Sequence, residues 1–368
     1  MTEISPSVAE ALRPGVEQRY AAELARLREA DHADKPENWY LSPVAVRRFI
    51  LGDPALDIAR KFYGDDALVE RAIVTLMGNQ GLMLVGEPGT AKSLLSELLA
   101  AAISGDSGLT IQGTAGTTED HLKYAWNYAL LLAEGPGPRS LVPSALYTAM
   151  QTGKLVRFEE ITRCPPEIQD VLISLLSEKQ LMVPELGDAG RVHARRGFNI
   201  IATANLRDRG VHEMSSALKR RFNFETVRPI REHAFEVELV MSQLARELAA
   251  AQTLVRVERD VVALLVTTFQ ELRAGQTQEG TAIKTPDTVM STAEAVNVAY
   301  AAALEARYFG DGTLTPRELA AQLQGVVLKD NADDLRKVRH YFETVVRERA
   351  RKDALWKRFH DAARTLWQ

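Results

Sequence analysis

One stretch decides the fold of this chain: Gly86-Glu87-Pro88-Gly89-Thr90-Ala91-Lys92-Ser93. It follows an apolar run, Gly81–Val85, and precedes a run with helical character, Leu94–Ile103. A strand, a glycine-bearing loop and a helix in this order are the context in which such a pattern binds phosphate. The backbone N–H groups of the loop point at phosphate oxygens, and the N-terminus of the helix adds partial positive charge.

The loop therefore predicts a nucleotide site. In such a site Lys92 reaches the outer phosphates, and the hydroxyl of Ser93 holds Mg²⁺. The consensus has glycine directly before the lysine, whereas this chain has Ala91, the smallest other choice, which can preserve the phosphate cradle. The alternative is a loop that only caps a helix. The predicted ATP-contacting residues are Gly86, Glu87, Pro88, Gly89, Thr90, Ala91, Lys92, Ser93 and Leu94.

The chain around the loop alternates strand-like and helical segments. Short apolar runs bounded by turns suit strands that are buried on both faces of a parallel sheet. Ser42-Pro43 has the form of a helix start, and Thr315-Pro316-Arg317-Glu318 that of a capping box. The predicted strands are Gly81–Val85, Lys154–Phe158 and Phe198–Thr203.

These patterns predict an α/β fold in which a P-loop core has a parallel sheet flanked by helices. The predicted divisions are a helical N-terminal segment (1–64), the ATPase core (65–230) and an all-helical lid with the C-terminal helices (231–368).

Two acids end the second predicted strand, Leu155-Val156-Arg157-Phe158-Glu159-Glu160. In a P-loop ATPase the first acid serves the Mg²⁺ shell and the second polarises the attacking water. The first acid is usually aspartate, and Glu159 is longer by one methylene. Arg157 is unusual inside a buried strand, and the sequence offers no account of it. The alternative for the two acids is a solvated pair at the end of a strand.

Three further polar residues are candidates for catalysis. Asn205 follows the third predicted strand and could hold the attacking water or the terminal phosphate, although asparagine after a strand is often only a turn residue. Either Arg220 or Arg221 could reach the ATP of a neighbouring subunit, and Arg221 is the favoured candidate. That role requires an oligomer. The alternative is that these basic residues favour a helix C-terminus through its dipole.

Composition excludes several classes of protein. The chain has 368 residues, is 46% hydrophobic and carries a net charge of -4, so nucleic acid is not an expected partner. The single cysteine, Cys164, excludes an internal disulfide framework and is expected to be a packed residue rather than a nucleophile. The first residues lack the pattern of a secretion signal, and no apolar stretch is long enough to span a membrane, so we expect a cytoplasmic protein.

The loop, the acid pair, the strand ending in Ala202-Thr203-Ala204-Asn205 and the arginine stretch, in this order, resemble the MoxR family of AAA+ ATPases. Within that family the chain looks most like the YehL-type branch. The resemblance implies a homo-oligomer, a hexameric ring, with chaperone-like activity on other proteins. It also implies a partner protein that can carry a von Willebrand factor A domain.

The chain departs from the family pattern at Glu159 and in the lid. The family's lid often carries Ser-Pro-Arg, and the matching stretch is expected at Thr285-Pro286-Asp287, which would put an acid where arginine senses ATP. These departures leave open a module that binds ATP without hydrolysing it. A motor stimulated by nucleic acid is a further alternative, because related rings translocate nucleic acid. Two stretches, 117–140 and 181–196, could contact a partner, although core packing is favoured for the aromatic residues of the first.

Overall fold

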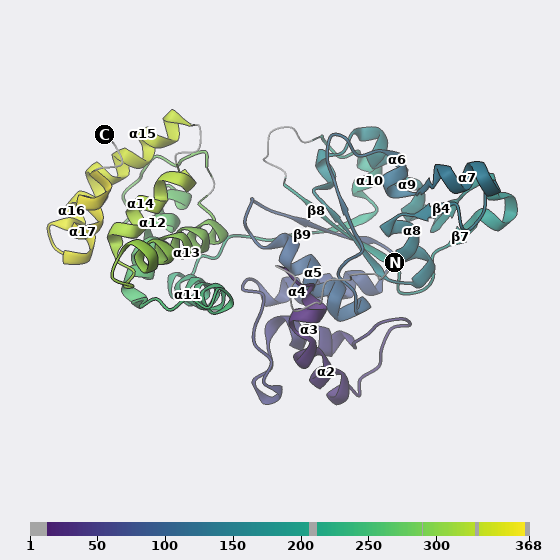
Figure 1. Ribbon diagram of the computed structural model, residues 1–368, viewed down its shortest axis with the longest axis horizontal. Helices are drawn as coiled ribbons and strands as arrows, with labels where there is room; N and C mark the ends of the chain where they lie inside the picture. The colour runs from purple at the N-terminus through teal and green to yellow at the C-terminus, as the bar shows by residue number, and fades with distance from the viewer. Residues whose placement is uncertain (1–12, 206–211, 289, 328–330, 365–368) are drawn as a thin grey trace. The chain divides into compact units, whose positions relative to one another are not determined.

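The computed structural model describes residues 13–205, 212–288, 290–327 and 331–364. The N-terminal residues on which the expected absence of a secretion signal rests lie outside these ranges. The chain divides into two compact units, which are described separately (Figure 1). One contains Met1–Gly86 and Ala91–Val227, and the other contains Arg228–Gln368 with the short loop Glu87–Thr90.

The first unit is built on a parallel sheet of five strands in the order β2-β5-β8-β1-β9. The three strands predicted from apolar runs are therefore confirmed, with β5 and β8 each beginning and ending one residue later than predicted. The short β2 and the edge strand β9 were not predicted. The strands are β1 (Gly81–Val85), β2 (Thr110–Gln112), β5 (Leu155–Glu159), β8 (Asn199–Ala204) and β9 (Phe222–Thr226).

Alternate side chains of the central strands enter two different hydrophobic cores, because successive residues of a strand point to opposite faces of the sheet. Leu82 and Leu84 pack with the N-terminal helices and α5, whereas Met83 and Val85 pack with α8 and α9. Figure 1 shows α3, α4 and α5 on one side of the sheet. The helices of this unit are α1 (Val16–Arg19), α2 (Ala21–Ala30), α3 (Pro43–Leu51), α4 (Asp66–Met77), α5 (Lys92–Ser104), α6 (Glu119–Leu122), α7 (Tyr128–Glu134), α8 (Ala145–Thr152), α9 (Pro166–Glu178) and α10 (Ser216–Lys219).

The predicted helix start at Ser42-Pro43 is confirmed, since the hydroxyl of Ser42 accepts a hydrogen bond from the N–H of Ala45 and Pro43 begins α3. Short segments complete the first unit. Two antiparallel pairs of strands lie outside the main sheet: β3 (Tyr124–Trp126) with β4 (Leu141–Pro143), and β6 (Gln180–Met182) with β7 (Arg191–His193). The 3-10 turns are Pro54–Leu56, Ile161–Arg163 and Pro184–Gly190.

The second unit is helical throughout its regular elements, as predicted. At the start of α14 the carboxylate of Glu318 accepts from the N–H of Thr315, which is one of the two bonds of the predicted capping box, and the hydroxyl of Thr315 accepts from the N–H of Arg317. None of the helices in the described ranges combines the length and the hydropathy that a membrane span requires. The helices are α11 (His233–Ala250), α12 (Arg259–Ala274), α13 (Thr292–Phe309), α14 (Pro316–Val327), α15 (Ala332–Tyr341), a π-helical turn (Phe342–Val346), α16 (Arg347–Ala350) and α17 (Ala354–Ala363).

A buried carboxylate joins α12 to the last helices. Glu271 is 2% exposed and accepts hydrogen bonds from the Tyr341 hydroxyl at 2.6 Å and from Arg349 at 2.6 and 3.0 Å. Arg349 also pairs with the exposed Glu279 and lies 4.8 Å from the ring centroid of Trp356. A buried charge is tolerated only when it is paired in this way, so Glu271 holds these helices together.

We expect Glu271→Gln to destabilise the second unit by about 3 kcal/mol, because the guanidinium of Arg349 would then lose its buried counter-charge. Hydrogen–deuterium exchange of α12 and α15 measures the effect. Glu279→Gln is the matched control, since it removes a mostly exposed partner of the same arginine. Equal protection of α12 in the two variants would show that burial of the Glu271 pair does not matter.

Candidate functional site

The predicted site residues of the core gather at one edge of the sheet. The strands β5, β8 and β1 are neighbours, and the carboxyl ends of parallel strands lie at the same edge. The glycine-bearing loop follows β1, the acid pair ends β5, and Asn205, which is half-buried, follows β8. The order of strands therefore brings together residues that are more than a hundred positions apart in the sequence.

The loop turns into α5 through a left-handed residue. Ala91 has φ 66° and ψ 24° and caps α5, which begins at Lys92. This conformation favours glycine, and an L-residue adopts it at a cost of about 1–2 kcal/mol. The Nζ of Lys92 donates to the carbonyl oxygen of Gly86 at 3.0 Å, so the side chain folds back over its own loop.

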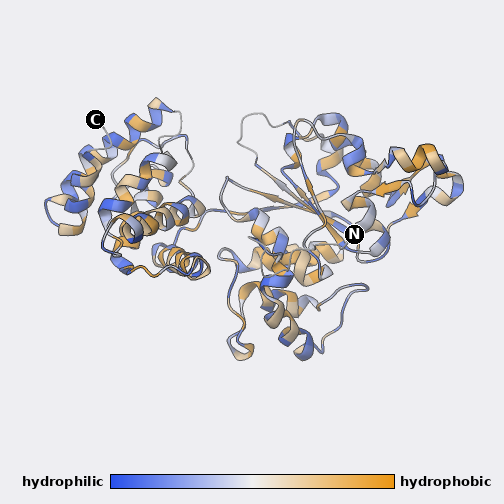
Figure 2. Cartoon of the chain, in the orientation of Figure 1, coloured by the Kyte–Doolittle hydropathy of each residue, from blue (hydrophilic) through white to orange (hydrophobic). Residues whose placement is uncertain are grey.

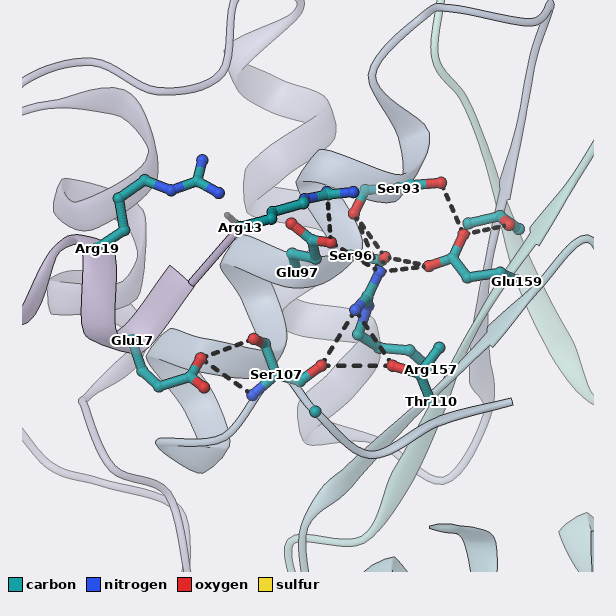
Figure 3. Close-up of polar contacts among 12 residues, drawn as sticks. Arg13, Glu17, Arg19, Ser93, Ser96, Glu97, Ser107, Thr110, Arg157 and Glu159 are labelled. Carbon is teal, nitrogen blue, oxygen red and sulfur yellow. Dashed lines mark hydrogen bonds and ion pairs between the residues drawn. The ribbon is translucent and has the colours of Figure 1, made fainter. Parts of the chain in front are cut away.

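Glu159 is the centre of a buried hydrogen-bond network (Figure 3). Its Oε2 accepts from the hydroxyls of Ser93 at 2.8 Å and Thr203 at 2.7 Å. Its Oε1 accepts from the hydroxyl of Ser96 at 2.7 Å and from Nη2 of Arg157 at 2.8 Å. The network thus joins the end of β5 to the first turn of α5 and to the neighbouring strand β8.

This environment keeps Glu159 ionised. Burial by itself raises the pKa of the carboxyl, but hydrogen bonds from Ser96, Thr203 and Ser93, together with the charge of Arg157, outweigh it and hold the pKa below its usual value. The site therefore presents a negatively charged oxygen beside the hydroxyl of Ser93. Oxygen ligands of this kind are those that Mg²⁺ prefers.

Glu160 is held at the turn that follows β5. It has φ 54° and ψ 47°, and its N–H donates to the hydroxyl of Thr203 at 3.0 Å. The half-exposed carboxylate of Glu160 forms an ion pair with Arg163. Gly113 lies against this turn, and a side chain there would bring a Cβ to 2.4 Å from the Glu160 carbonyl oxygen. Glu160 is thus fixed at the edge of the sheet by its backbone, while its side chain remains accessible.

The structure does not bring the two candidate arginines to this edge. Both precede β9, which starts beside the start of β1, so they lie at the opposite edge of the sheet, about 15 Å away along five strand residues. Arg221 donates to the Ser177 hydroxyl at 3.0 Å and to the Ala217 carbonyl oxygen at 2.7 Å. Arg220 is exposed and donates to the Ser216 carbonyl oxygen at 3.4 Å. From this position neither guanidinium can reach the glycine-bearing loop of its own subunit.

Sequence reasoning missed three residues of the network. Ser96 lies three positions after Ser93 on the same face of α5, and that spacing was an available signal. Thr203 was recognised only as part of a strand. Arg157, which had no explanation, lies two positions before Glu159 and hence on the same face of β5. Cys164 is fully buried, and burial raises the pKa of its thiol, as expected for a packed residue.

The expected lid stretch, Thr285-Pro286-Asp287, lies just before α13. A Ser-Pro-Arg stretch has the form of a helix start, with serine as the cap and proline at the first helical position. In the structure that start is Ser291, Thr292 and Ala293, whereas Thr285–Asp287 lies before the helix. The stretch expected to match the motif thus lies outside the helix and carries no arginine. Asp287 pairs with Lys337 at 3.5 Å and donates its N–H to the buried Asp334.

The aromatic stretch divides into two parts. Tyr124 and Trp126 are half-buried against the core, and the Tyr124 hydroxyl donates to Glu185 at 2.9 Å. The helix α7, which follows, has the apolar sequence Tyr-Ala-Leu-Leu-Leu-Ala-Glu, and none of its residues is buried. Tyr128 is 72% exposed and Leu132 is 89% exposed. Figure 2 shows this helix as an apolar segment. Core packing accounts for the first two aromatic residues and fails for Tyr128.

We expect Ala91→Gly to raise the free energy of unfolding by roughly 0.5–1 kcal/mol, because glycine adopts the left-handed conformation without the Cβ clash while losing more backbone entropy. Chemical denaturation of the full chain, followed by far-UV circular dichroism, measures this change. Ala245→Gly, at an exposed position inside α11, is the control and should destabilise its helix by about 1 kcal/mol. A loss of stability in both variants would contradict strain at Ala91.

Comparisons with known proteins identify the family. The model for AAA domains of the dynein-related subfamily matches residues 81–222, and the model for the C-terminal domain of YehL-like AAA+ ATPases matches residues 234–366. The uncharacterized protein YehL of Escherichia coli (strain K12) is 52% identical over 364 residues, which cover 99% of this chain and 100% of that protein.

Two more distant similarities concern parts of the chain or the fold. Midasin of Dictyostelium discoideum is 28% identical over 125 residues, which are 34% of this chain and 2% of midasin. A crystal structure of NtrX from Brucella abortus has a TM-score of 0.50 at 15% identity and covers 82% of this chain and 64% of that one, so it shows the fold alone. The resemblance to MoxR-type AAA+ ATPases and their YehL-type branch is confirmed, and the chain belongs to the YehL-like AAA+ ATPases.

Proposed function

We propose that this protein hydrolyses ATP in the presence of Mg²⁺ and uses the energy to remodel a partner protein. The observation that carries the proposal is the 2.8 Å hydrogen bond between the hydroxyl of Ser93 and the carboxylate of Glu159. This bond joins the first turn of α5, the helix that follows the loop, to the acidic end of the strand β5. In this proposal Glu160, the next residue, lies beside the terminal phosphate of a nucleotide bound in the loop.

The residues at the sheet edge supply the parts that phosphoryl transfer needs. The backbone of the loop holds phosphate oxygens, Lys92 binds the outer phosphates, and Ser93 with Glu159 holds Mg²⁺. When bound, the metal neutralises the charge that develops on the phosphate oxygens. Mg²⁺ commonly takes only one or two carboxylates besides water and phosphate oxygens, so this donor set is sufficient. Asn205 orients the attacking water, and Glu160 accepts its proton after leaving Arg163.

The functional unit in this proposal is a ring of six identical subunits. Arg221 lies at the edge of the sheet opposite the loop, a position from which it is available to the nucleotide of a neighbouring subunit. An arginine delivered in trans stabilises the transition state of phosphoryl transfer strongly. Its present bonds to Ser177 and Ala217 hold it in place until the neighbour arrives.

The helix α7 is the surface that we assign to the partner protein. Contiguous apolar patches are rarely exposed on soluble monomers, and those that are exposed commonly mark protein–protein interaction sites. Leu132, Tyr128 and Val142 are all exposed on α7 or on the adjacent strand β4. A partner that carries a von Willebrand factor A domain is part of the proposal through the family resemblance.

A module that binds ATP without turning it over is the second candidate. The expected lid stretch has Asp287 where the family motif has arginine, and the carboxylate of Glu160 forms an ion pair with Arg163. Both features weaken the coupling of nucleotide to catalysis. Tight ATP binding with no phosphate release, alone or with a partner, would favour this candidate.

We expect Glu160→Gln to bind ATP normally and to lose hydrolysis by about 10²–10⁴-fold, because the amide cannot accept the proton of the attacking water. Phosphate release and binding of a fluorescent ATP analogue measure the two effects. Lys92→Ala should lose both activities. The control is Glu178→Gln, at an exposed position at the end of α9. Undiminished hydrolysis in both Glu160→Gln and Lys92→Ala would end the proposal.

The trans role of Arg221 can be tested by mixing two inactive variants. Arg221→Ala should bind ATP but turn over at least about 10³-fold more slowly, as expected when a trans arginine is lost. Mixing it with Glu160→Gln should restore part of the activity, because some interfaces then combine an intact Glu160 with a neighbour's intact Arg221. If Arg221→Ala hydrolyses ATP normally, or if mixing restores nothing, Arg221 does not act in trans.

Leu132→Glu should leave ATP hydrolysis unchanged and weaken partner capture, because it places a charge at the centre of the apolar surface of α7. Pull-downs with Glu160→Gln held in ATP, with and without the second substitution, measure the difference by mass spectrometry. The same proteins captured in equal amounts by both variants would exclude α7 as the partner surface.

A further inference from the structure

The strand β5 carries a buried arginine that the nucleotide chemistry described above does not use. Arg157 is 6% exposed and lies on the same face of the strand as Glu159, because side chains two positions apart point the same way. A guanidinium in such a place is costly to bury unless every donor finds a partner. Its presence in the middle of an otherwise apolar strand therefore needs a compensating role.

All three nitrogens of Arg157 are occupied (Figure 3). Nε donates to the Ser96 hydroxyl at 2.9 Å. Nη1 donates to the Ser107 carbonyl oxygen at 3.1 Å and to the Thr110 hydroxyl at 3.2 Å. Nη2 donates to Oε1 of Glu159 at 2.8 Å and lies 3.5 Å from Glu97. The side chain is thus fixed by α5, by the segment before β2 and by β2 itself.

The two carboxylate oxygens of Glu159 therefore have different hydrogen-bond partners. Oε1 is anchored by Arg157 and Ser96, both inside the core. Oε2 faces the hydroxyl of Ser93, the proposed metal ligand, and is aligned by Thr203. An aspartate at this position would be shorter by about one chain bond, roughly 1.5 Å, and could not satisfy both sides at once.

We propose that Arg157 is a positioning residue that adapts the metal site to a glutamate. It holds the inner oxygen of the longer side chain, so that the outer oxygen stays beside Ser93 and is ready for Mg²⁺. The inference deepens the proposed function and rests on it. Arg157 and Glu159 are then a matched pair, and neither can be changed alone without loss of metal-dependent nucleotide binding.

The test measures the affinity of a fluorescent ATP analogue with Mg²⁺ and with EDTA. Mg²⁺ should raise the affinity of the protein for the nucleotide, and in Arg157→Met this gain should be about 10-fold smaller. Removal of a residue that hydrogen-bonds a metal ligand commonly lowers metal affinity by at least about that factor. Affinity in EDTA should be unchanged. The control is Arg13→Met, since Arg13 is mostly exposed and pairs with Glu97 at 2.9 Å without touching Glu159.

A second variant keeps the test decisive if Arg157→Met does not fold. Glu159→Asp, with Arg157 in place, should also lose about 10-fold of the Mg²⁺ effect, because the shorter carboxylate leaves either Ser93 or Arg157 without its partner. In the double variant Arg157→Met/Glu159→Asp, the loss of the Mg²⁺ effect should be smaller than the sum of the two single losses. The shorter aspartate then needs to contact only Ser93, because no buried guanidinium remains to be paired.

Two results would overturn the inference. One is an unchanged gain in affinity from Mg²⁺ in Arg157→Met, whether or not the affinity in EDTA also falls, and the other is normal Mg²⁺ dependence in Glu159→Asp. Failure of the proposed function looks different, since the unsubstituted protein would then show no Mg²⁺-dependent binding of the nucleotide, and both proposals would fall together.

Discussion

The carboxylate of Glu159 accepts hydrogen bonds from Ser93 and Ser96 of α5, from Thr203 of β8 and from Arg157 of its own strand. A buried, ionised carboxylate is stable only with such a set of donors, so the set fixes three elements relative to one another. The first turn of α5 cannot move away from the end of β5 without leaving the charge unpaired. The geometry of the phosphate loop, which runs into α5, depends on this one group.

Further constraints then follow for the turn after β5. Thr203 aligns Glu159 through its hydroxyl and, through the same oxygen, accepts the N–H of Glu160. Glu160 adopts a left-handed conformation that few residues take without support, and Gly113 provides the space that its carbonyl group needs. Glu159 and Glu160 are thus positioned by the same hydroxyl group. The other oxygen of Glu159 is held by Arg157, so the arginine also contributes to the position of this carboxylate.

The sequence was sufficient to predict the strands that are buried on both faces of the sheet and the helix starts at Ser42 and Thr315, because these features depend on local patterns. It was insufficient for β9, in which most side chains are exposed, and for β2, which has three residues. Arg157 could not be explained in advance because its partners, Ser96, Ser107 and Thr110, lie about 50 to 60 positions away. The loop that contains Asp287 is held by Asp334, which is 46 to 47 positions away in the sequence, so its structure could not be predicted from a local pattern.

The central claim is that the loop around Lys92 and the carboxylate of Glu160 meet at a single nucleotide. A crystal structure with Mg²⁺ and a non-hydrolysable ATP analogue tests it most directly. The account predicts the terminal phosphate between Lys92 and Glu160, with the metal at the Ser93 hydroxyl beside Glu159. A nucleotide bound elsewhere, or one in the loop with the carboxylate of Glu160 turned away from the terminal phosphate, would contradict it.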